Sequence, residues 1–300
     1  MGPTRSYLIC TTPRSGSTLL CRYLAATGCA GAPQEYLLEA ALPGLFEKRG
    51  VADFPSYFSA LLAAETTPNG VFGAKLMGAP DVFAAALARL RELPGLGAAR
   101  LAPWDLVAAA FPRVEYVWLT RRDRLRQAIS FYRALRSGRW QSTQARGAPP
   151  PPPPELDLGA VDDCLSDLLA WDSAWEDYFA GAGVRPVTLV YEDLVRDPGA
   201  SVRALLAALR IELPPSWAPG PPERERLADA TSERWLEAYR SGAKRARSGA
   251  RRRGAAVEAG EYVRLEGVPA RELGARVPAA RLAKALLSRI AGGRRAPGAE

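Results

Sequence analysis

Residues 14–18 carry a guanidinium and three hydroxyl groups around one glycine. A guanidinium fork matches the oxygen atoms of phosphate or sulfate, and hydroxyl groups donate further hydrogen bonds to them. The loop lies between two apolar runs, residues 6–10 and 19–26. A strand, a short loop and a helix start in this order direct free N–H groups and the positive helix end toward an anion. We therefore predict an anion-binding loop made of Arg14, Ser15, Gly16, Ser17 and Thr18.

This loop differs from the Walker loop of nucleotide triphosphatases, which has a lysine directly after its last glycine. Here Arg14 precedes Gly16 and no lysine follows it. A P-loop-like kinase, which would also need a carboxylate for Mg²⁺, is therefore a weaker alternative. The non-functional alternative is an ordinary strand, turn and helix with Gly16 in the turn.

A second arginine and a serine follow another apolar run, residues 114–119. Arg121 lies where this run ends, and Ser130 is nine residues further on, across a predicted helix start. Open α/β sheets bind ligands at the carboxyl ends of their strands. These two side chains therefore predict a second anion contact, with a solvated arginine-rich helix face as the alternative.

Proton transfer must depend on groups other than histidine, because the chain contains none. This excludes a Ser-His-Asp triad, a His-ligated zinc ion and a His general base, and leaves carboxylates, lysine, tyrosine or cysteine. Glu35 follows the first predicted helix, and Lys75 lies in the apolar run 71–77 beside glycines. Taken alone, each would more often be a solvated surface charge.

The 300-residue chain is 48% hydrophobic and 24% charged, as expected of a globular protein. Its net charge of +8 favours anionic partners, and a basic nucleic-acid-binding protein is an alternative of another class. The four cysteines form no C-x-x-C pair, which indicates a reducing compartment. Since no signal-peptide pattern and no long apolar stretch is present, we expect a cytoplasmic protein.

Four strand-like runs alternate with helical patterns along the chain. The runs are near residues 6–10, 71–77, 114–119 and 186–191. This alternation predicts an α/β protein with a three-layer P-loop-like fold, in which helices flank a central, mostly parallel sheet. We expect one domain over residues 1–240 and a basic, Ala/Gly/Arg-rich, partly disordered extension over 241–300. The proline run 149–154 predicts an extended surface connector.

Several of these stretches occur in one consistent order over residues 5–240 and together resemble a known family. The chain resembles sulfotransferases that use 3′-phosphoadenosine-5′-phosphosulfate (PAPS), and more narrowly the bacterial trehalose 2-sulfotransferase family. The resembling stretches are residues 14–20, 26–28, 33–36, 67–77 and 121–133.

The resemblance implies transfer of a sulfuryl group from PAPS to a hydroxyl of a trehalose-like sugar or glycolipid, without a metal. It places the 5′-phosphosulfate on the loop 14–18, the 3′-phosphate on Arg121 and Ser130, and the general base at Glu35. It also implies a homodimer, a small-molecule partner and no specific nucleic acid. The acceptor-binding residues that it implies are Pro33, Gln34, Glu35, Tyr36 and Lys75.

Two positions depart from the family pattern. Pro13 stands where the family has a glutamine that contacts trehalose, and Gly78 stands where it has a tryptophan. The sequence therefore supports the assignment of PAPS as donor better than the assignment of trehalose as acceptor. A nucleotide-binding protein without catalytic activity is a further alternative. Substitution of Glu35 would leave the function of such a protein unchanged, whereas a sulfotransferase would lose turnover.

Overall fold

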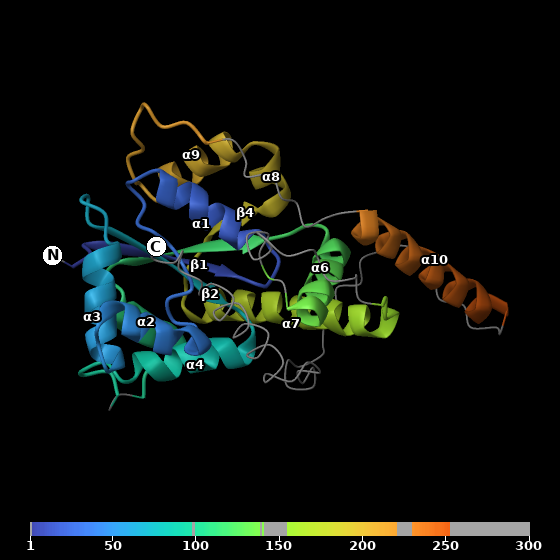
Figure 1. The fold of residues 1–300 in the computed structure, drawn as a ribbon, viewed down its shortest axis with the longest axis horizontal. Coiled ribbons are helices and arrows are strands. Elements are labelled where there is room, and N and C mark those ends of the chain that lie inside the picture. Colours follow the sequence, from blue (N-terminus) through green and yellow to red (C-terminus); the bar gives the residue numbers. More distant parts are fainter. Residues whose placement is uncertain (1, 98–99, 139, 141–154, 221–229, 253–300) are drawn as a thin grey trace, which may run out of the picture.

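Four parallel strands form the single sheet of the computed structural model, which describes residues 2–97, 100–138, 140, 155–220 and 230–252 (Figure 1). The strands are β1 (Arg5–Thr11), β2 (Val71–Met77), β3 (Val114–Thr120) and β4 (Val187–Val190). Their order in the sheet is β2-β1-β3-β4, and every neighbouring pair is parallel. The prediction of a parallel α/β sheet built from these four runs is confirmed.

The strands lie between two layers of helices, as the three-layer prediction requires. One face carries α1 (Ser17–Ala26), α8 (Tyr191–Arg196) and α9 (Pro198–Ala208), which Figure 1 shows together above the sheet. The other face carries α2 (Leu42–Arg49), α3 (Phe54–Glu65), α4 (Pro80–Leu90), α5 (Pro103–Ala110) and α7 (Leu158–Gly181). A short 3₁₀ helix, η1 (Glu39–Ala41), precedes α2.

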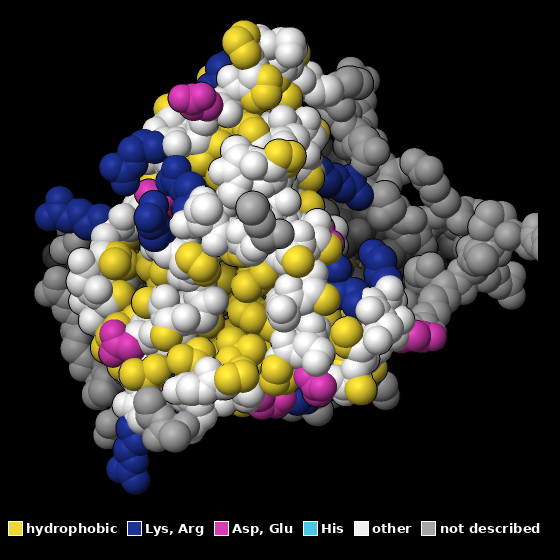
Figure 2. Space-filling model, turned by 90° about the vertical axis from the view of Figure 1, so that its left-hand side faces the viewer, with side chains coloured by type: hydrophobic (Ala, Val, Ile, Leu, Met, Phe, Trp, Pro, Cys, Tyr) yellow, Lys and Arg dark blue, Asp and Glu magenta, His cyan; other side chains and the backbone are white. Residues whose placement is uncertain are grey.

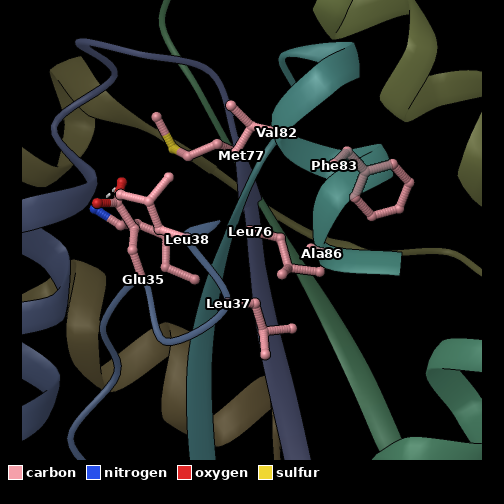
Figure 3. Close-up of a pocket in the computed structure, with 9 residues that line it drawn as sticks. Glu35, Leu37, Leu38, Leu76, Met77, Val82, Phe83 and Ala86 are labelled. Atoms are coloured by element: carbon pink, nitrogen blue, oxygen red, sulfur yellow. Dashed lines mark ion pairs between the residues drawn. The ribbon is translucent and has the colours of Figure 1, made fainter. Parts of the chain in front are cut away.

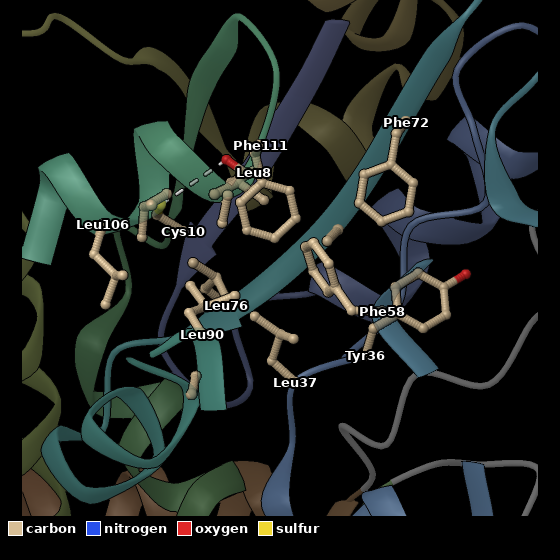
Figure 4. Close-up of a cluster of buried hydrophobic side chains, with 14 of the residues drawn as sticks. Leu8, Cys10, Tyr36, Leu37, Phe58, Phe72, Leu76, Leu90, Leu106 and Phe111 are labelled. Atoms are coloured by element: carbon tan, nitrogen blue, oxygen red, sulfur yellow. Dashed lines mark hydrogen bonds between the residues drawn. The ribbon is translucent and has the colours of Figure 1, made fainter. Parts of the chain in front are cut away.

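Because both faces of the sheet are covered, its central strand is a continuous apolar run rather than an alternating one. Six consecutive residues of β1, from Ser6 to Thr11, are buried. Alternate residues enter different cores: Leu8 packs under α3 and α5, whereas Ile9 packs under α1 and α9. Figure 4 shows the first of these cores, with Phe58, Phe72 and Phe111 gathered beside the sheet.

A third core joins α6 (Arg124–Ser137) and α7 to the start of α10 (Ala230–Arg252). Phe131 lies edge-on to Trp171 with ring centroids 5.7 Å apart, and Tyr132 lies 5.7 Å from Trp235. α7 begins at Leu158, because the Asp157 side chain accepts the Ala160 N–H at 3.1 Å and caps the first turn.

α10 runs across residue 240, where we predict the domain boundary, and it projects away from the sheet in Figure 1. The proline run 149–154 and most of the predicted extension lie outside the described residues. Within the described ranges, no helix combines the length and apolar character needed to span a bilayer.

Figure 2 views the molecule from the end at which the N-terminus and α3 lie in Figure 1. Apolar side chains gather in the middle of this face, with basic and acidic side chains around them. This is the end at which β1 begins. The predicted anion-binding loop follows Thr11 at the opposite end of the strand.

Candidate active site

The predicted anion-binding loop connects β1 to α1 at the carboxyl edge of the sheet. Arg14 and Gly16 both have left-handed backbones, with φ of 63° and 88°. A Cβ on Gly16 would clash with the ring of Tyr191, so glycine is required here for its backbone and for its small size. Among the described residues no side chain caps α1, and its first turn has no acid. The helix N-terminus is therefore suited to receive an anion.

Arg14 lies at the centre of the predicted donor-binding residues. Its Nε donates to Ser130 Oγ at 2.9 Å, and its Nη1 donates to the main-chain oxygen of Trp140. Arg121 Nη1 donates to the Arg14 carbonyl oxygen at 3.2 Å. Arg14, Arg121 and Ser130, which are far apart in the sequence, therefore lie in one hydrogen-bonded group.

Arg121 is held from the other side by α8. Its guanidinium lies 4.6 Å from the ring centroid of Tyr191, and its Nε is 3.7 Å from Glu192 Oε1. Burial lowers the pKa of Arg121, although Tyr191 and Glu192 oppose this shift. An arginine remains charged even so, and the result is a largely desolvated cation beside the loop.

The Glu192 carboxylate also occupies the turn between β3 and α6. It accepts the N–H groups of Arg122 at 3.0 Å and Asp123 at 3.1 Å. Burial alone would raise the pKa of Glu192, but these two donors, the N–H of Glu192 itself and the charge of Arg121 together hold the pKa below its usual value. An acidic side chain thus orients Arg121 and the start of α6 together.

A buried polar network supports the loop from below. Gln127 Nε2 donates to Thr12 Oγ1 at 2.9 Å and to the Pro13 carbonyl oxygen at 2.8 Å. Asp172 forms an ion pair with Arg124, and the Thr12 hydroxyl lies 3.5 Å from its carboxylate. Burial raises the pKa of Asp172 to about 6, and the neighbouring Arg124 opposes the rise. These side chains fix the backbone from which Arg14 projects.

The two residues predicted near the acceptor, Glu35 and Lys75, form a buried ion pair. Lys75 Nζ is 3.1 Å from Glu35 Oε1, and their side chains are only 4% and 8% exposed. The same Nζ donates to Ser17 Oγ at 3.3 Å. The Lys75 backbone N–H donates to the Gln34 carbonyl oxygen at 2.9 Å, so β2 positions this segment. Lys75 therefore connects the predicted base to the anion-binding loop.

A cavity that opens to solvent lies between the loop and this ion pair, with about 450 Å³ of empty space including its open mouth. Its polar lining comes from Arg14, Ser17 and Thr18 on one side and from Glu35 and Lys75 on the other. The remaining lining residues are apolar: Pro13, Met77, Ala79, Val82 and Trp140. A second, much smaller cavity, enclosed mainly by buried core side chains, adjoins the first, because Glu35, Lys75, Met77 and Val82 line both (Figure 3). A cationic anion-binding surface and a carboxylate thus face one shared space.

Other predicted site residues lie outside these two cavities. Ser15 is buried behind the loop, where its hydroxyl is 2.5 Å from that of Thr11. Pro33 is buried and Gln34 is exposed, and neither lines a cavity. The Tyr36 ring packs in the core 6.1 Å from Phe72, and its hydroxyl donates to a main-chain oxygen. These four side chains do not line the open space of the site, and neither do Gly16, Arg121 and Ser130 of the predicted donor site.

Sequence reasoning missed several supporting residues, namely Gln127, Trp140, Asp172 and Tyr191. Asp172 lies among apolar residues of α7, where a carboxylate needs a buried partner, and this was the available signal. Trp140 acts through its main-chain oxygen, which no residue type indicates.

A family model for the Stf0 sulphotransferases matches residues 6–242 of the chain. Two curated relatives, both named trehalose 2-sulfotransferase, are each 31% identical to it, one from Mycobacterium tuberculosis and one from Mycolicibacterium smegmatis. Each alignment covers 80% of this chain and 96% of the relative.

Among solved structures, the sulfotransferase domain from the curacin biosynthetic pathway aligns with 16% identity and a TM-score of 0.43, over 77% of this chain and 82% of that chain. The sulfotransferase domain from the Synechococcus PCC 7002 olefin synthase aligns with 17% identity and a TM-score of 0.39, over 86% and 90%. The family match spans every residue of the site described above. The chain therefore belongs to the Stf0 sulphotransferase family and is a sulfotransferase.

Proposed function

We propose that this enzyme transfers the sulfuryl group of PAPS to a hydroxyl group of a sugar or glycolipid. The observation that carries the proposal is the cavity of about 450 Å³, in which the loop residues Arg14, Ser17 and Thr18 face Glu35 and Lys75. Sulfuryl transfer needs a bound polyanion and a proton acceptor within one space, and this cavity has groups suited to both.

The loop 14–18 and the N-terminus of α1 would bind the 5′-phosphosulfate of the donor. Loop N–H groups and the Arg14 guanidinium suit its oxygen atoms, and they would stabilise charge that develops during transfer. Arg121 and Ser130 would bind the 3′-phosphate. Their hydrogen-bonded contacts with Arg14 support this assignment, because they bring a second cation and a hydroxyl beside the loop.

The acceptor hydroxyl would lie beside Glu35 and attack the sulfur atom in line with the bond that breaks. A new O–S bond forms, the S–O bond to the 5′-phosphate breaks, and its electron pair stays on 3′-phosphoadenosine-5′-phosphate (PAP). The acceptor proton passes to the Glu35 carboxylate as the new bond forms. Lys75, which contacts Glu35 and Ser17, would hold the base against the loop.

The nature of the acceptor rests on the two relatives named trehalose 2-sulfotransferase, which support a carbohydrate hydroxyl. The position of Gly78 distinguishes this chain from the family pattern, which has a tryptophan there. Any side chain at Gly78 would clash with Trp175, whose Nε1 donates to the Thr11 carbonyl oxygen at 3.1 Å. Trp175 therefore occupies the space that the Cβ of a tryptophan at position 78 would need, and the acceptor need not be trehalose.

The experiment that tests the donor is calorimetric titration of the full chain with PAP. We expect one-to-one binding that Arg14→Ala and Arg121→Ala each weaken at least about tenfold, the loss of a charge-assisted contact. Arg210→Ala is the matched control, because Arg210 is exposed at the other end of β3 and pairs with Glu115. ATP, the kinase substrate, should bind more weakly than PAP. Absence of PAP binding, or binding indifferent to both arginines, would overturn the proposal.

Three further predictions accompany this proposal: a homodimer, which the family resemblance implies, and a cytoplasmic location and a catalytic domain over residues 1–240, which the sequence pattern indicates. Light scattering of the purified full chain measures the first directly. A monomer at micromolar concentration would contradict it.

A further inference from the structure

We infer that Gln127 is a positioning residue of the donor site, through which the enzyme distinguishes nucleotides with phosphates at both the 5′ and 3′ positions from nucleotides with a 5′-phosphate alone. The inference rests on the proposed function, because it takes the loop 14–18 as the 5′ site and Ser130 as a 3′ contact. Gln127 lines neither of the two cavities, so it acts on the donor only through the residues that it holds.

Gln127 is completely buried, and each polar atom of its amide group has a partner. Its Nε2 donates to Thr12 Oγ1 at 2.9 Å and to the Pro13 carbonyl oxygen at 2.8 Å, and its Oε1 accepts from Arg124 Nη1 at 3.1 Å. Exchange of the amide nitrogen and oxygen would put two donors together at Arg124 and two acceptors together at Pro13. These partners therefore determine the orientation of the amide group.

Arg124, which orients the amide group, is held from two further elements. Its Nη2 donates to Thr120 Oγ1 at 2.6 Å at the end of β3, and its Nη1 forms the ion pair with Asp172 of α7. Gln127 thus belongs to a network that joins α6 to β3, to α7 and to the anion-binding loop. A buried polar network with all its members bonded makes the local structure rigid.

The bond from Gln127 to Pro13 matters because the next residue is Arg14. The backbone of Arg14 has a φ of 63°, a left-handed conformation that a residue with a Cβ keeps only when its surroundings hold it. Gln127 holds the peptide before Arg14, through the Pro13 oxygen. Arg121 holds the peptide after it, by donating to the Arg14 carbonyl oxygen at 3.2 Å. These two contacts set the direction in which the Arg14 side chain leaves the loop.

The helix that carries Gln127 also holds the Arg14 side chain. Ser130 lies three residues after Gln127 on α6, so the two side chains leave the same face of the helix. Ser130 Oγ accepts from Arg14 Nε at 2.9 Å. α6, which lies beyond the end of β1 in Figure 1, therefore contacts both the loop backbone and the guanidinium. One rigid element thus sets the distance between the 5′ site and the 3′ contact, and Gln127 links that element to the loop backbone.

The competing explanation is that Gln127 only satisfies buried polar groups. Its loss would then lower stability, but the folded molecules would keep their relative affinities for different nucleotides. If Gln127 instead sets the distance between the two anion sites, its loss misaligns one site relative to the other. A ligand with two phosphates must bind both sites at once and is weakened by this misalignment, whereas a ligand with one phosphate is not. The test therefore compares two ligands on the same variant.

The experiment titrates PAP and adenosine 5′-phosphate, which lacks the 3′-phosphate, into the full chain by calorimetry. The intact chain is compared with Gln127→Met, which keeps the length of the side chain without its amide group, and with Gln127→Asn, which keeps the amide group one methylene shorter. The control is Thr27→Val, because the buried Thr27 hydroxyl donates to the Leu24 carbonyl oxygen at 2.6 Å at the far end of α1. Thermal unfolding measures the stability of each variant.

For the intact chain we expect PAP to bind at least about a hundredfold more tightly than adenosine 5′-phosphate, because the 3′-phosphate adds charge-assisted contacts. Gln127→Met and Gln127→Asn should reduce this ratio of Kd values to about tenfold or less. Thr27→Val should lower the unfolding temperature and leave the ratio unchanged. Ser130→Ala should reduce the ratio in the intact chain but change it little in Gln127→Met, because contacts that act as one unit are not additive.

A ratio in Gln127→Met equal to that of the intact chain would overturn the inference, whatever the loss of stability. Equal Kd values of the intact chain for the two ligands would overturn it as well. Should Gln127→Met fail to fold, the ratio in Gln127→Asn decides in the same way. Failure of PAP to bind the intact chain would instead refute the proposed function, so the two failures are distinguishable.

Discussion

At the scale of single residues, the ion pair of Glu35 and Lys75 is the most consequential contact in the site. Both side chains are almost fully buried, so removing one partner leaves an uncompensated charge in a poorly solvated place. Lys75→Met should therefore lower the free energy of unfolding by about 3 kcal/mol, and Lys75→Met/Glu35→Gln should recover most of this loss.

Urea unfolding of the single and double variants measures this coupling. Arg89→Met is the matched control, since Arg89 pairs with Glu39 on the surface with both side chains about one-third or more exposed. Its effect should stay within about 1 kcal/mol. Equal losses at Lys75 and Arg89 would show that burial of the inner pair has no energetic consequence.

Substitution of Glu35 should impair catalysis without impairing nucleotide binding. If it accepts the acceptor proton, Glu35→Gln should lower kcat by about 10²–10⁴-fold while the Kd for PAP changes little, because the carboxylate faces the acceptor side of the cavity. Steady-state transfer and calorimetry on the same preparation test both parts. Glu39→Gln, four residues further along the chain on the surface, should retain full turnover. Unchanged turnover in Glu35→Gln would show that another group accepts the proton.

Asp172 gives a pH dependence whose sign follows from its environment. Burial raises its pKa to about 6, so between about pH 4 and 6 the folded protein keeps a proton that the unfolded chain has released. This group therefore stabilises the fold most below about pH 4, and its contribution is lost as the pH rises through 6.

Relative to Asp172→Asn, which cannot ionise, the intact chain should lose on the order of 2–3 kcal/mol of unfolding free energy between pH 4 and 7. Denaturant titrations across this range measure the difference. Asp177 lies on the exposed side of α7, so the difference in unfolding free energy between the intact chain and Asp177→Asn should not change with pH. A level profile for Asp172→Asn as well would contradict the raised pKa.

At the scale of elements, the turn into α1 depends on Gly16 for two separable reasons. Gly50 provides the matched control: its φ of 64° is also left-handed, but a Cβ there would meet nothing within 4 Å. Gly50→Ala should therefore cost only about 1 kcal/mol. Gly16→Ala should cost more and abolish PAP binding, because its methyl group would displace Tyr191 from Arg121.

Unfolding free energies and PAP titrations compare the two alanine variants. Gly16→Ala/Tyr191→Ala should recover the steric part of the stability loss while PAP binding stays weak. PAP affinity that survives Gly16→Ala would show that the turn is not part of the donor site.

The elements themselves were largely predictable from the sequence. β2 matches its predicted range, and β1, β3 and β4 differ from theirs by two residues or fewer, because buried parallel strands are unbroken apolar runs between glycine- and proline-rich turns. Tyr191, which was predicted to end a strand, begins α8. The family resemblance gave Arg14, Arg121 and Ser130, and the structure brings them together.

What was not predictable is which side chains face the cavities and what supports them. The segment 33–36 alternates between core and solvent, so only Glu35 of its four residues reaches the shared space. The contacts of Asp172 with Arg124 and Thr12 join two helices and a loop. Such contacts depend on the tertiary packing of distant segments, which no local pattern records.

At the scale of the whole molecule, the burial of the four cysteines indicates how tightly the helix layers pack against the sheet. Cys10, Cys21, Cys29 and Cys164 are all free and buried. Burial raises the pKa of Cys10 and that of Cys164, the latter to about 12, which further lowers their reactivity.

Ellman's reagent should therefore label fewer than one thiol per native chain within minutes and all four in urea. The labelling rate should follow global unfolding, because the cysteines lie in all three cores or at their margins. Rapid labelling of any cysteine in the native protein would contradict this packing and identify a layer that opens locally.

The place of β1 in the middle of the sheet also has a consequence for how the protein is made. β1 is the first of the four strands of this sheet to leave the ribosome, yet Ser6 pairs with Phe72 on one side and Val114 on the other. At about 5–20 residues per second, both edges of β1 stay unpaired for roughly ten seconds during synthesis. Unpaired strand edges are sites of aggregation. The strand that leads into the predicted anion-binding loop is thus the one that a nascent chain must shield longest, and chaperone supply should govern the yield of active enzyme.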